Sequence, residues 1–330
     1  MLDLPVTNTE LMAALPSHLA EVEKIFEAQI ASDLPPVADL LEHVAGYRGK
    51  MLRPTLTLLS GMAASGGDYT AMESTSLRQL AAVIEMIHMA TLVHDDVLDE
   101  ADERRGTVSV NHLRGNEMAV MLGDYLISNA FHLCSKIGDP SLNESLGETT
   151  GTLCEGELVQ LHHRDDLGLD LPTYLEIVRR KTAVLVGACG ELGARVCGGD
   201  EETCAAFGIY GEKLGIAFQV RDDVLDLEGE QELVGKTLGR DLVTGKLTLP
   251  LILLLEEIEA DRFDVLVEKI QARDADWVLA QLRESGSIAK AIEFASEYID
   301  AAKAAVAGKV PDSMMNVFNE LADSVLVRQR

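Results

Sequence analysis

The sequence predicts an all-α fold, and three observations support this class. The nine prolines leave long intervals without proline at 55–139, 173–249 and 251–310, and proline disrupts a helix interior more than any other residue. These intervals are rich in Ala, Leu, Glu, Met and Ile, which are helix formers or are at least tolerated in helices. No stretch alternates apolar and polar residues between hairpin turn signals, as a half-buried strand would.

Four ranges are expected to form the principal helices. Residues 76–99 contain no Gly or Pro and are mostly apolar, which is typical of a buried helix. Residues 173–196 and 202–227 are similar, with glycines tolerated at close contacts. Residues 288–306 are rich in alanine and amphipathic. Apolar residues make up 47% of the chain, which is ample for a sizeable core.

The chain is expected to form one domain over residues 1–330. Its length allows either two domains of about 150 residues or one large helical domain. No internal repeat, low-complexity tract or linker divides it. Charged residues are 25% of the total, so wholesale disorder is excluded.

The charge and cysteine content exclude several classes of protein. With 28 Lys and Arg against 55 Asp and Glu the net charge is −27, whereas nucleic-acid binding needs a basic surface. Five cysteines without a C-x-x-C spacing indicate reduced thiols rather than a disulfide framework or a zinc site. The amino-terminal residues do not resemble a signal peptide, and the longest apolar stretch, 247–255, is too short to span a membrane. We therefore expect a cytoplasmic protein without a membrane span.

An acidic motif closes the first predicted helix. In Leu92-Val-His-Asp-Asp-Val-Leu-Asp99 the carboxylates Asp95 and Asp99 lie about 40° apart on a helix, hence on one face. Crowded carboxylates on an apolar helix repel one another and are costly to bury without a cation. Oxygen ligands without His or Cys favour Mg²⁺. A solvated helix end remains the simpler interpretation of this motif taken alone.

The same spacing recurs at Asp222, Asp223 and Asp226, again after an apolar helix. Two copies make the solvated interpretation much less favourable. If the two helices pack around a common cavity, the carboxylates can face each other and hold several Mg²⁺ ions. Such ions usually keep waters and also bind substrate phosphates.

The cations of this acidic chain are bunched near Lys50 and Arg53, at Arg104 and Arg105, at 179–181, and at 235–246. Arginine binds phosphate through a bidentate fork and lysine through a mobile point charge. Together with the acidic motifs, the clusters suggest a site for two polyphosphate groups, one bound through metal and one bound directly by Arg and Lys. His88 shares the helix face of Asp95 and Asp99, so contact with a diphosphate and a structural core role are both open for it.

These motifs resemble those of the trans (head-to-tail) polyprenyl diphosphate synthases, from about Gly46 to Pro250. The shared motifs are the two D-D-x-x-D sequences, G-K-x-x-R-P, R-R-G, K-T, F-Q and G-K-x-x-x-x-D-x-x-x-G-K-x-T-L-P. The resemblance implies a bundle of long helices around a deep apolar cavity, the isoprenoid synthase type of fold. It also implies a homodimer, which could touch a membrane peripherally when product is released.

The resemblance further implies a role for each matching residue. Isopentenyl diphosphate would be bound by Lys50, Arg53, His88 and Arg105, and the allylic diphosphate by Arg104. About three Mg²⁺ ions per site would be held by Asp95, Asp96, Asp99, Asp222, Asp223 and Asp226. The allylic site would be completed by Lys181, Thr182, Gln219, Lys236 and Lys246. Within these sets, the catalytic residues would be Asp95, Asp96, Asp222, Asp223, Lys181 and Lys236.

Product length is expected to depend on residues one to three turns before Asp95. Ala90 and Thr91 are small, and by the family pattern small residues there imply a long-chain product of the octaprenyl type. The helical wheel places Thr91 and Ile84 on the face of the acids and Ala90 off it, so the importance of Ala90 comes from the resemblance. Phe131 is the candidate floor of the cavity.

Three alternatives stay open. A short-chain synthase would make farnesyl or geranylgeranyl diphosphate. A terpene cyclase shares the first acidic motif but typically replaces the second and does not need Lys50 or Arg53. A non-catalytic regulatory subunit of a heteromeric synthase tends to lose one acidic motif, whereas both are present here.

Overall fold

The computed structural model describes residues 9–47, 49–228 and 239–328, and these fold almost entirely into helices. The all-α prediction is therefore confirmed. The chain divides into two compact units, the first made of residues up to 150, 188–208 and 306–317, and the second of 151–187, 209–305 and the residues from 318 onward. Four helices contribute residues to both units, namely α7 (Pro140–His162), α9 (Val184–Val196), α10 (Glu201–Leu227) and α17 (Asp312–Leu326). The organisation as one domain stays a prediction.

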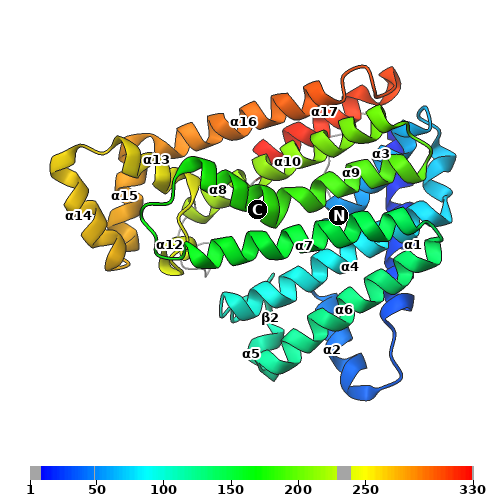
Figure 1. The fold of residues 1–330 in the computed structure, drawn as a ribbon, viewed down its shortest axis with the longest axis horizontal. Coiled ribbons are helices and arrows are strands. Elements are labelled where there is room, and N and C mark those ends of the chain that lie inside the picture. Colours follow the sequence, from blue (N-terminus) through cyan, green and yellow to red (C-terminus); the bar gives the residue numbers. More distant parts are fainter. Residues whose placement is uncertain (1–8, 48, 229–238, 329–330) are drawn as a thin grey trace. The chain divides into compact units, whose positions relative to one another are not determined.

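The first unit is built around α4 (Thr75–Leu98). Figure 1 shows α4 beside α6, and it also packs on α1 and α3. Nearly every side chain of α4 from Leu80 to Ala90 is buried, as expected of a helix that is apolar on all sides. Ser74 caps its start by accepting a hydrogen bond from the Leu77 N–H. The other elements that begin in this unit are α1 (Thr9–Ile30), α2 (Pro35–Ala45), α3 (Leu52–Ala64), η1 (Tyr69–Glu73), β1 (Glu103–Arg104), β2 (Thr107–Val108), α5 (Val110–Arg114), α6 (Asn116–Ile137), α7 (Pro140–His162), α10 (Glu201–Leu227) and α17 (Asp312–Leu326).

The second unit contains the later helices and a local irregularity. The predicted helix over 173–196 is interrupted by η2 (Arg179–Ala183), a π-helical turn between α8 (Leu171–Val178) and α9 (Val184–Val196). Asp170 caps α8, and Pro172 stands in its first turn, where proline is tolerated. The remaining elements are α12 (Arg240–Val243), α13 (Leu249–Glu257), α14 (Ala260–Gln271), α15 (Ala275–Ser285) and α16 (Ser287–Ala305).

One helix, α4, is long and apolar enough to pass a length-and-composition test for a membrane span. The tested window is 67% buried inside the structure, and the core helix of a soluble protein passes the same test. The sequence analysis treated 247–255 as the longest apolar stretch, but α4 is longer and is the helix that passes this test.

Candidate functional site

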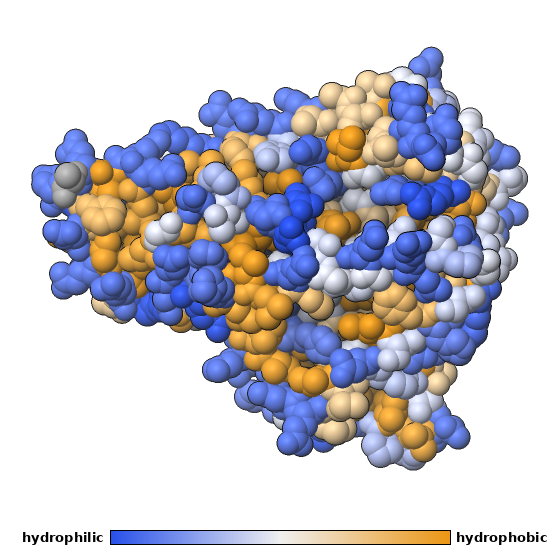
Figure 2. All heavy atoms as spheres, viewed as in Figure 1, coloured by the Kyte–Doolittle hydropathy of each residue, from blue (hydrophilic) through white to orange (hydrophobic). Residues whose placement is uncertain are grey.

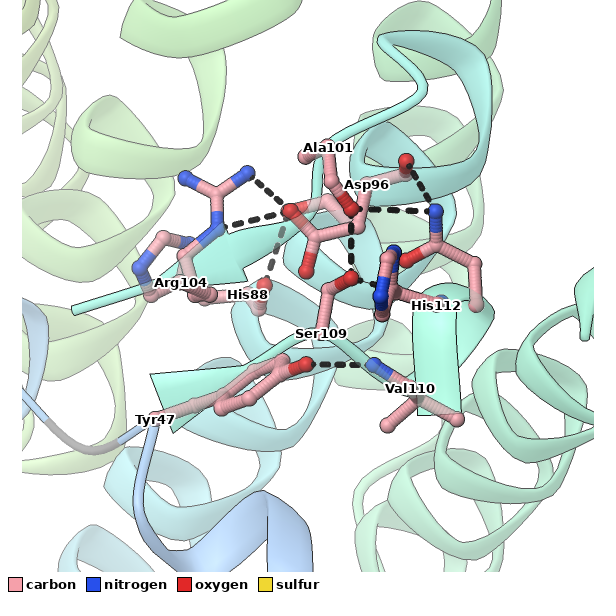
Figure 3. Close-up of polar contacts among 10 residues, drawn as sticks. Tyr47, His88, Asp96, Ala101, Arg104, Ser109, Val110 and His112 are labelled. Atoms are coloured by element: carbon pink, nitrogen blue, oxygen red, sulfur yellow. Dashed lines mark hydrogen bonds and ion pairs between the residues drawn. The ribbon is translucent and has the colours of Figure 1, made fainter. Parts of the chain in front are cut away.

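The first acidic motif lies at the carboxyl end of α4. Asp95 and Asp96 belong to its last turn, and Asp99 is the C-cap residue. The Asp96 side chain is 1% exposed, and its Oδ1 accepts hydrogen bonds from Nε (2.8 Å) and Nη2 (2.5 Å) of Arg104 (Figure 3). This pairing matters because a buried charge left without its partner costs about 3–5 kcal/mol. Asp95 and Asp99 are half-buried.

A β-hairpin that comes after the motif presents Arg104 and Arg105. β1 pairs antiparallel with β2, with Arg104 opposite Thr107. The two turn residues, Arg105 and Gly106, have φ angles of 53° and 77°, as the type I′ turn of tight hairpins requires. From this turn the Arg105 guanidinium donates a hydrogen bond to the Tyr47 carbonyl. The hairpin therefore directs the two arginines of the R-R-G motif to different partners, Arg104 to Asp96 and Arg105 to the Tyr47 carbonyl.

Buried hydrogen bonds anchor the base of the hairpin (Figure 3). The Tyr47 hydroxyl accepts from the Val110 N–H at 2.8 Å. The Ser109 hydroxyl donates to the Ala101 carbonyl. Because Tyr47 and Ser109 are both fully buried, these contacts hold the hairpin against the end of α4.

His88 lies among three arginines. Burial and the positive charges of Arg53, Arg105 and Arg104, in that order, hold its pKa well below the usual value. Arg53 comes from the first turn of α3 and the other two come from the hairpin, so the fold gathers cations from separate segments. A diphosphate is the type of ligand that such a group of forked donors suits.

Lys50 stands next to this cluster along the chain. It is exposed and precedes Arg53 by three residues. A Cβ atom at the neighbouring Gly49 would lie 2.5 Å from Nη1 of Arg105, so glycine allows the backbone to approach that guanidinium. The structure thus brings Arg53, His88 and Arg105 together and places Lys50 next to Gly49, while their binding of a diphosphate stays a prediction.

The second acidic motif lies on α10, where Asp223 is 4% exposed. Its Oδ2 accepts a hydrogen bond from the Tyr174 hydroxyl (2.6 Å), and its Oδ1 accepts one from Nε2 of Gln219 (2.9 Å). Oε1 of Gln219 accepts in turn from the Thr182 hydroxyl at 2.9 Å. Thr182 and Gln219, which were predicted to bind substrate, and Asp223, which was predicted to bind metal, therefore form one chain of hydrogen bonds.

Asp222 and Asp226 have different partners. Asp222 pairs with Nη1 of Arg328 at 2.5 Å, and the guanidinium of that arginine lies 4.4 Å from the centre of the Phe218 ring. Oδ2 of Asp226 accepts from the N–H of Asp241 at 3.1 Å. Asp226 thus fixes the start of the segment that leads to Lys246, whose own N–H donates to the Asp241 carbonyl at 2.8 Å.

A pocket of about 100 Å³ opens beside Asp223 in the second unit. Its polar wall combines two lysines with carboxylates and amides. Its apolar wall comes from α8 and from Leu169 and Leu247, which lie just before α8 and α13. The lining residues are Gln160, His163, Leu169, Tyr174, Ile177, Val178, Lys181, Thr182, Gln219, Asp223, Asp241, Lys246, Leu247 and Thr248. Four predicted residues of the allylic site, Lys181, Thr182, Gln219 and Lys246, therefore line one pocket. Lys236 lies outside the described residues.

Two glycines bring neighbouring helices close to η2. A Cβ atom at Gly156 on α7 would lie 2.6 Å from the backbone N of Lys181. A Cβ atom at Gly215 on α10 would lie 2.6 Å from the Cα of Ala183. Real Cβ contacts are essentially never this short. The π turn is thus packed against backbone on both sides, and this packing sets the position of Lys181 and Thr182.

The electrostatics of the second motif fit a divalent cation. Burial, and then the nearby Asp241 carboxylate, raise the pKa of Asp223 to about 8. Burial also raises the pKa of Asp226. A cation would stabilise the charged form of both groups, and carboxylate oxygens are the donors that Mg²⁺ prefers. Within 9–47, 49–228 and 239–328, however, no three metal-ligating side chains are gathered into a ready-made cage.

The sequence did not reveal several residues around the pocket and the second acidic motif. Tyr174 donates to Asp223, and Glu157 forms an ion pair with Lys181. Asp241 is part of a shared motif but was not predicted as a site residue, although its negative charge raises the pKa of Asp223. Arg328, the partner of Asp222, is 106 residues away in sequence. The D-x-x-x-G-K spacing could have predicted Asp241 as a site residue. Tyr174, Glu157 and Arg328 reach the site only through tertiary contacts, which no local spacing predicts.

The four residues proposed to control product length occupy different environments in the first unit. Ile84 and Ala90 are fully buried in α4, and the Thr91 hydroxyl donates to the His88 carbonyl. Phe131 on α6 is only half-buried. A small cavity of about 10 Å³ next to α4 is lined instead by Val22, Glu23, Phe26, Met51, Glu85 and Met89.

Known proteins are similar to this chain over most of its length. A family model described as polyprenyl synthetase matches residues 35–283. Heptaprenyl diphosphate synthase component 2 of Geobacillus stearothermophilus is 33% identical over 310 residues, covering 93% of this chain and 95% of the relative. Nonaprenyl diphosphate synthase of Mycobacterium tuberculosis is 33% identical over 290 residues (87% and 85%). A short chain isoprenyl diphosphate synthase of Methanothermobacter thermautotrophicus is 36% identical over 255 residues (74% and 75%).

Solved structures agree with the family match. A polyprenyl synthase from Caulobacter crescentus, crystallised with calcium and isoprenyl diphosphate, superimposes with a TM-score of 0.88 at 33% identity and covers 97% of both chains. The fold is therefore that of the isoprenoid synthases, as the resemblance implied. Family, fold and motifs agree: the chain belongs to the polyprenyl synthetase family and is an enzyme of the transferase class.

Proposed function

We propose that the protein is a Mg²⁺-dependent prenyltransferase that condenses isopentenyl diphosphate with an allylic diphosphate and releases diphosphate. The product is a long-chain all-trans polyprenyl diphosphate. The observation that carries this proposal is the pocket of the second unit, where Lys181, Thr182, Gln219 and Lys246 surround a carboxylate of the second acidic motif. The relative crystallised with calcium and isoprenyl diphosphate supports a divalent cation and a prenyl diphosphate as ligands.

The allylic diphosphate is assigned to that pocket. Lys181 and Lys246 stabilise the negative charge that grows as the carbon–oxygen bond breaks and the diphosphate leaves with the electron pair. Thr182 and Gln219 orient the diphosphate oxygens. Asp95, Asp96, Asp99, Asp222, Asp223 and Asp226 hold Mg²⁺, with Arg104 and Lys236 completing the allylic site. Bound Mg²⁺ supplies Lewis-acid stabilisation of the leaving group.

Isopentenyl diphosphate is assigned to the cations around His88. Arg53 and Arg105 bind its diphosphate through their forked donors, and Lys50 adds a mobile charge. Held there, its double bond attacks the allylic carbon and forms the new carbon–carbon bond, to which proximity contributes much of the rate. A proton then leaves the carbon next to the new cationic centre, and the departing diphosphate accepts it. Apolar walls keep water away from the allylic cation.

A long product is favoured by the small side chains of Ala90 and Thr91 before the first acidic motif. Ile84 and Phe131 are proposed to bound the space for the growing tail. Long-chain relatives support this assignment, whereas the 36% identical short-chain relative supports a farnesyl- or geranylgeranyl-type product. Product mass separates the two.

We propose a cytoplasmic homodimer. Figure 2 shows apolar side chains over α5 and the first turns of α6, where Leu113, Met118 and Met121 are 43%, 39% and 63% exposed. Such a cluster is typical of an association surface. The relative named component 2 of a heptaprenyl synthase favours a second possibility, a heteromeric enzyme that needs another chain. The presence of both acidic motifs favours catalysis by this chain itself.

The test is direct. Purified protein is incubated with isopentenyl diphosphate, Mg²⁺ and each allylic primer in turn, and the products are measured by mass spectrometry. We expect long-chain products from the single chain, loss of activity with EDTA and recovery with added Mg²⁺. Light scattering of the same sample gives the oligomeric state. A chain that stays inactive alone but gains activity when a partner subunit is added would support the heteromeric alternative.

A further inference from the structure

Tyr174 is the one aromatic side chain with a hydroxyl in the pocket lining. It is 4% exposed and lies in the first turn of α8, behind the Asp170 cap. Buried tyrosine hydroxyls usually find a hydrogen-bond partner. The partner of this one is a carboxylate of the second acidic motif, 49 residues away in sequence, at 2.6 Å. This length lies at the short end of the O–H···O range of about 2.5–3.0 Å.

The hydrogen bond completes a set that fixes both oxygens of Asp223. Tyr174 donates to Oδ2 and Gln219 donates to Oδ1. Gln219 is itself oriented by Thr182, so its amide presents the nitrogen and not the oxygen. An ionised carboxylate has about four lone-pair sites, so one on each oxygen remains for a ligand. With both oxygens tethered, the carboxylate plane cannot rotate.

We propose that Tyr174 is a positioning residue, which holds Asp223 in the orientation that receives Mg²⁺ with the allylic diphosphate. This inference rests on the proposed function, because it takes Asp223 as a metal ligand. Tyr174 is assigned a role through Asp223 because its single hydroxyl hydrogen is donated to that carboxylate. Partners that orient a metal ligand typically change metal affinity about 10–100-fold when they are removed.

The decisive variant is Tyr174→Phe, which removes one oxygen and keeps the ring. The matched control is Tyr210→Phe in the same unit. Tyr210 is fully buried, and its hydroxyl donates to the Phe318 carbonyl at 2.8 Å, outside the pocket lining. Both variants lose one buried tyrosine hydrogen bond, but only one of these bonds ends on the acidic motif. Circular-dichroism melting shows whether each variant is folded.

The first measurement does not depend on turnover. Calorimetric titration of Mg²⁺ into protein with inorganic diphosphate should show about 10-fold weaker binding for Tyr174→Phe and a change of less than about two-fold for Tyr210→Phe. The second measurement is the initial rate against Mg²⁺ concentration. The half-saturating Mg²⁺ concentration should rise by a similar factor, while the KM for isopentenyl diphosphate stays as in the wild type.

A double-mutant cycle tests whether Tyr174 acts through Asp223. On an Asp223→Ala background, Tyr174→Phe should weaken Mg²⁺ and diphosphate binding by less than about two-fold. The positioning role of Tyr174 is overturned if Tyr174→Phe weakens Mg²⁺ binding on the Asp223→Ala background as much as in the wild type. It is also overturned if wild type, Tyr174→Phe and Tyr210→Phe bind Mg²⁺ with equal affinity. If wild type forms no polyprenyl product, the proposed function fails, yet the calorimetry still tests the positioning role by itself.

Discussion

At the scale of single residues, each acidic motif contains one deeply buried carboxylate with assigned donors. Asp96 is held by Arg104, and Asp223 is held by Tyr174 and Gln219. The motif spacing singled out the aspartates, and their role as metal ligands stays a prediction. Tyr174 and Arg328 could not be predicted, because they contact the motif across 49 and 106 residues. The spacing of neighbouring residues in a motif does not predict a contact between residues so far apart in sequence.

Removal of a motif carboxylate should abolish most of the turnover. We expect Asp95→Ala and Asp222→Ala each to lower kcat about 10²–10³-fold, because each removes a proposed ligand of the Mg²⁺ that would stabilise the leaving diphosphate. Steady-state rates at saturating Mg²⁺ provide the measurement. Asp264→Ala, which changes an exposed aspartate of α14, should keep the wild-type rate. Near-wild-type turnover in either motif variant would contradict the proposed metal site.

His88 should make stability depend on pH in a defined direction. Its pKa in the folded protein is lowered by burial and by Arg53, Arg105 and Arg104, so the unfolded chain binds more protons just below pH 6.5. Its contribution to stability is therefore present above pH 6.5 and is lost as the pH falls through that value toward the folded pKa. The melting temperature should fall less between pH 7.5 and 5.5 in His88→Gln than in wild type.

The matched control for this measurement is His132→Gln, which replaces an exposed histidine of α6. We expect its melting temperature to follow the wild-type pH curve. If His88→Gln follows that curve too, the arginine cluster does not act on His88 as described.

At the scale of elements, the helix predictions agree closely with the structure. The expected ranges 76–99, 202–227 and 288–306 correspond to Thr75–Leu98, Glu201–Leu227 and Ser287–Ala305. Long intervals without proline and a clear apolar pattern explain this agreement. The two-residue strands of the hairpin were not predicted because they are too short to show alternation. The π turn was not predicted because residues with good helix propensity form α and π turns alike.

The close approach of α7 to the π turn leads to an element-scale prediction. Gly156→Ala should destabilise the protein by about 1–3 kcal/mol, because the new Cβ would meet the backbone N of Lys181. It should also lower turnover by displacing Lys181. Urea denaturation and steady-state rates give the two measurements.

Gly151→Ala provides a control on the same helix. A Cβ at Gly151 has no atom within 4 Å, so alanine should stabilise the helix by about 0.5–1 kcal/mol. Equal effects of the two substitutions on stability and rate would show that the contact at Gly156 does not position Lys181.

At the scale of the whole molecule, the sequence predicted the all-α class and the family. The class depends on long intervals without proline, and the family depends on several motifs spread along the chain. Product length depends on the space available to a growing apolar tail, which is a property of many side chains together. Ile84 and Ala90 are buried in α4, whereas Phe131 is half-buried on α6. The long product therefore stays a prediction, which rests on the family pattern of small residues before the acidic motif and does not specify the number of isoprene units.

Ala90→Phe tests this control of length. A large ring in place of a buried methyl group should shorten the products while the chemistry at both diphosphate sites continues. Chromatography of the dephosphorylated products gives the distribution of chain lengths, and melting temperature reports the cost of overpacking, about 1–3 kcal/mol. A folded, active variant with the wild-type distribution would remove Ala90 from the set of length-determining residues.

The π turn at Arg179–Ala183 has a consequence for how this stretch can change during evolution. A π turn closes its hydrogen bonds one residue later than an α turn, so it holds one residue more than the α turn it replaces. Deleting that residue would restore an ordinary α-helix and would displace Lys181 and Thr182 from their present places in the pocket lining. Substitutions can accumulate here, but insertions and deletions should be selected against, and homologues should preserve the number of residues in this turn.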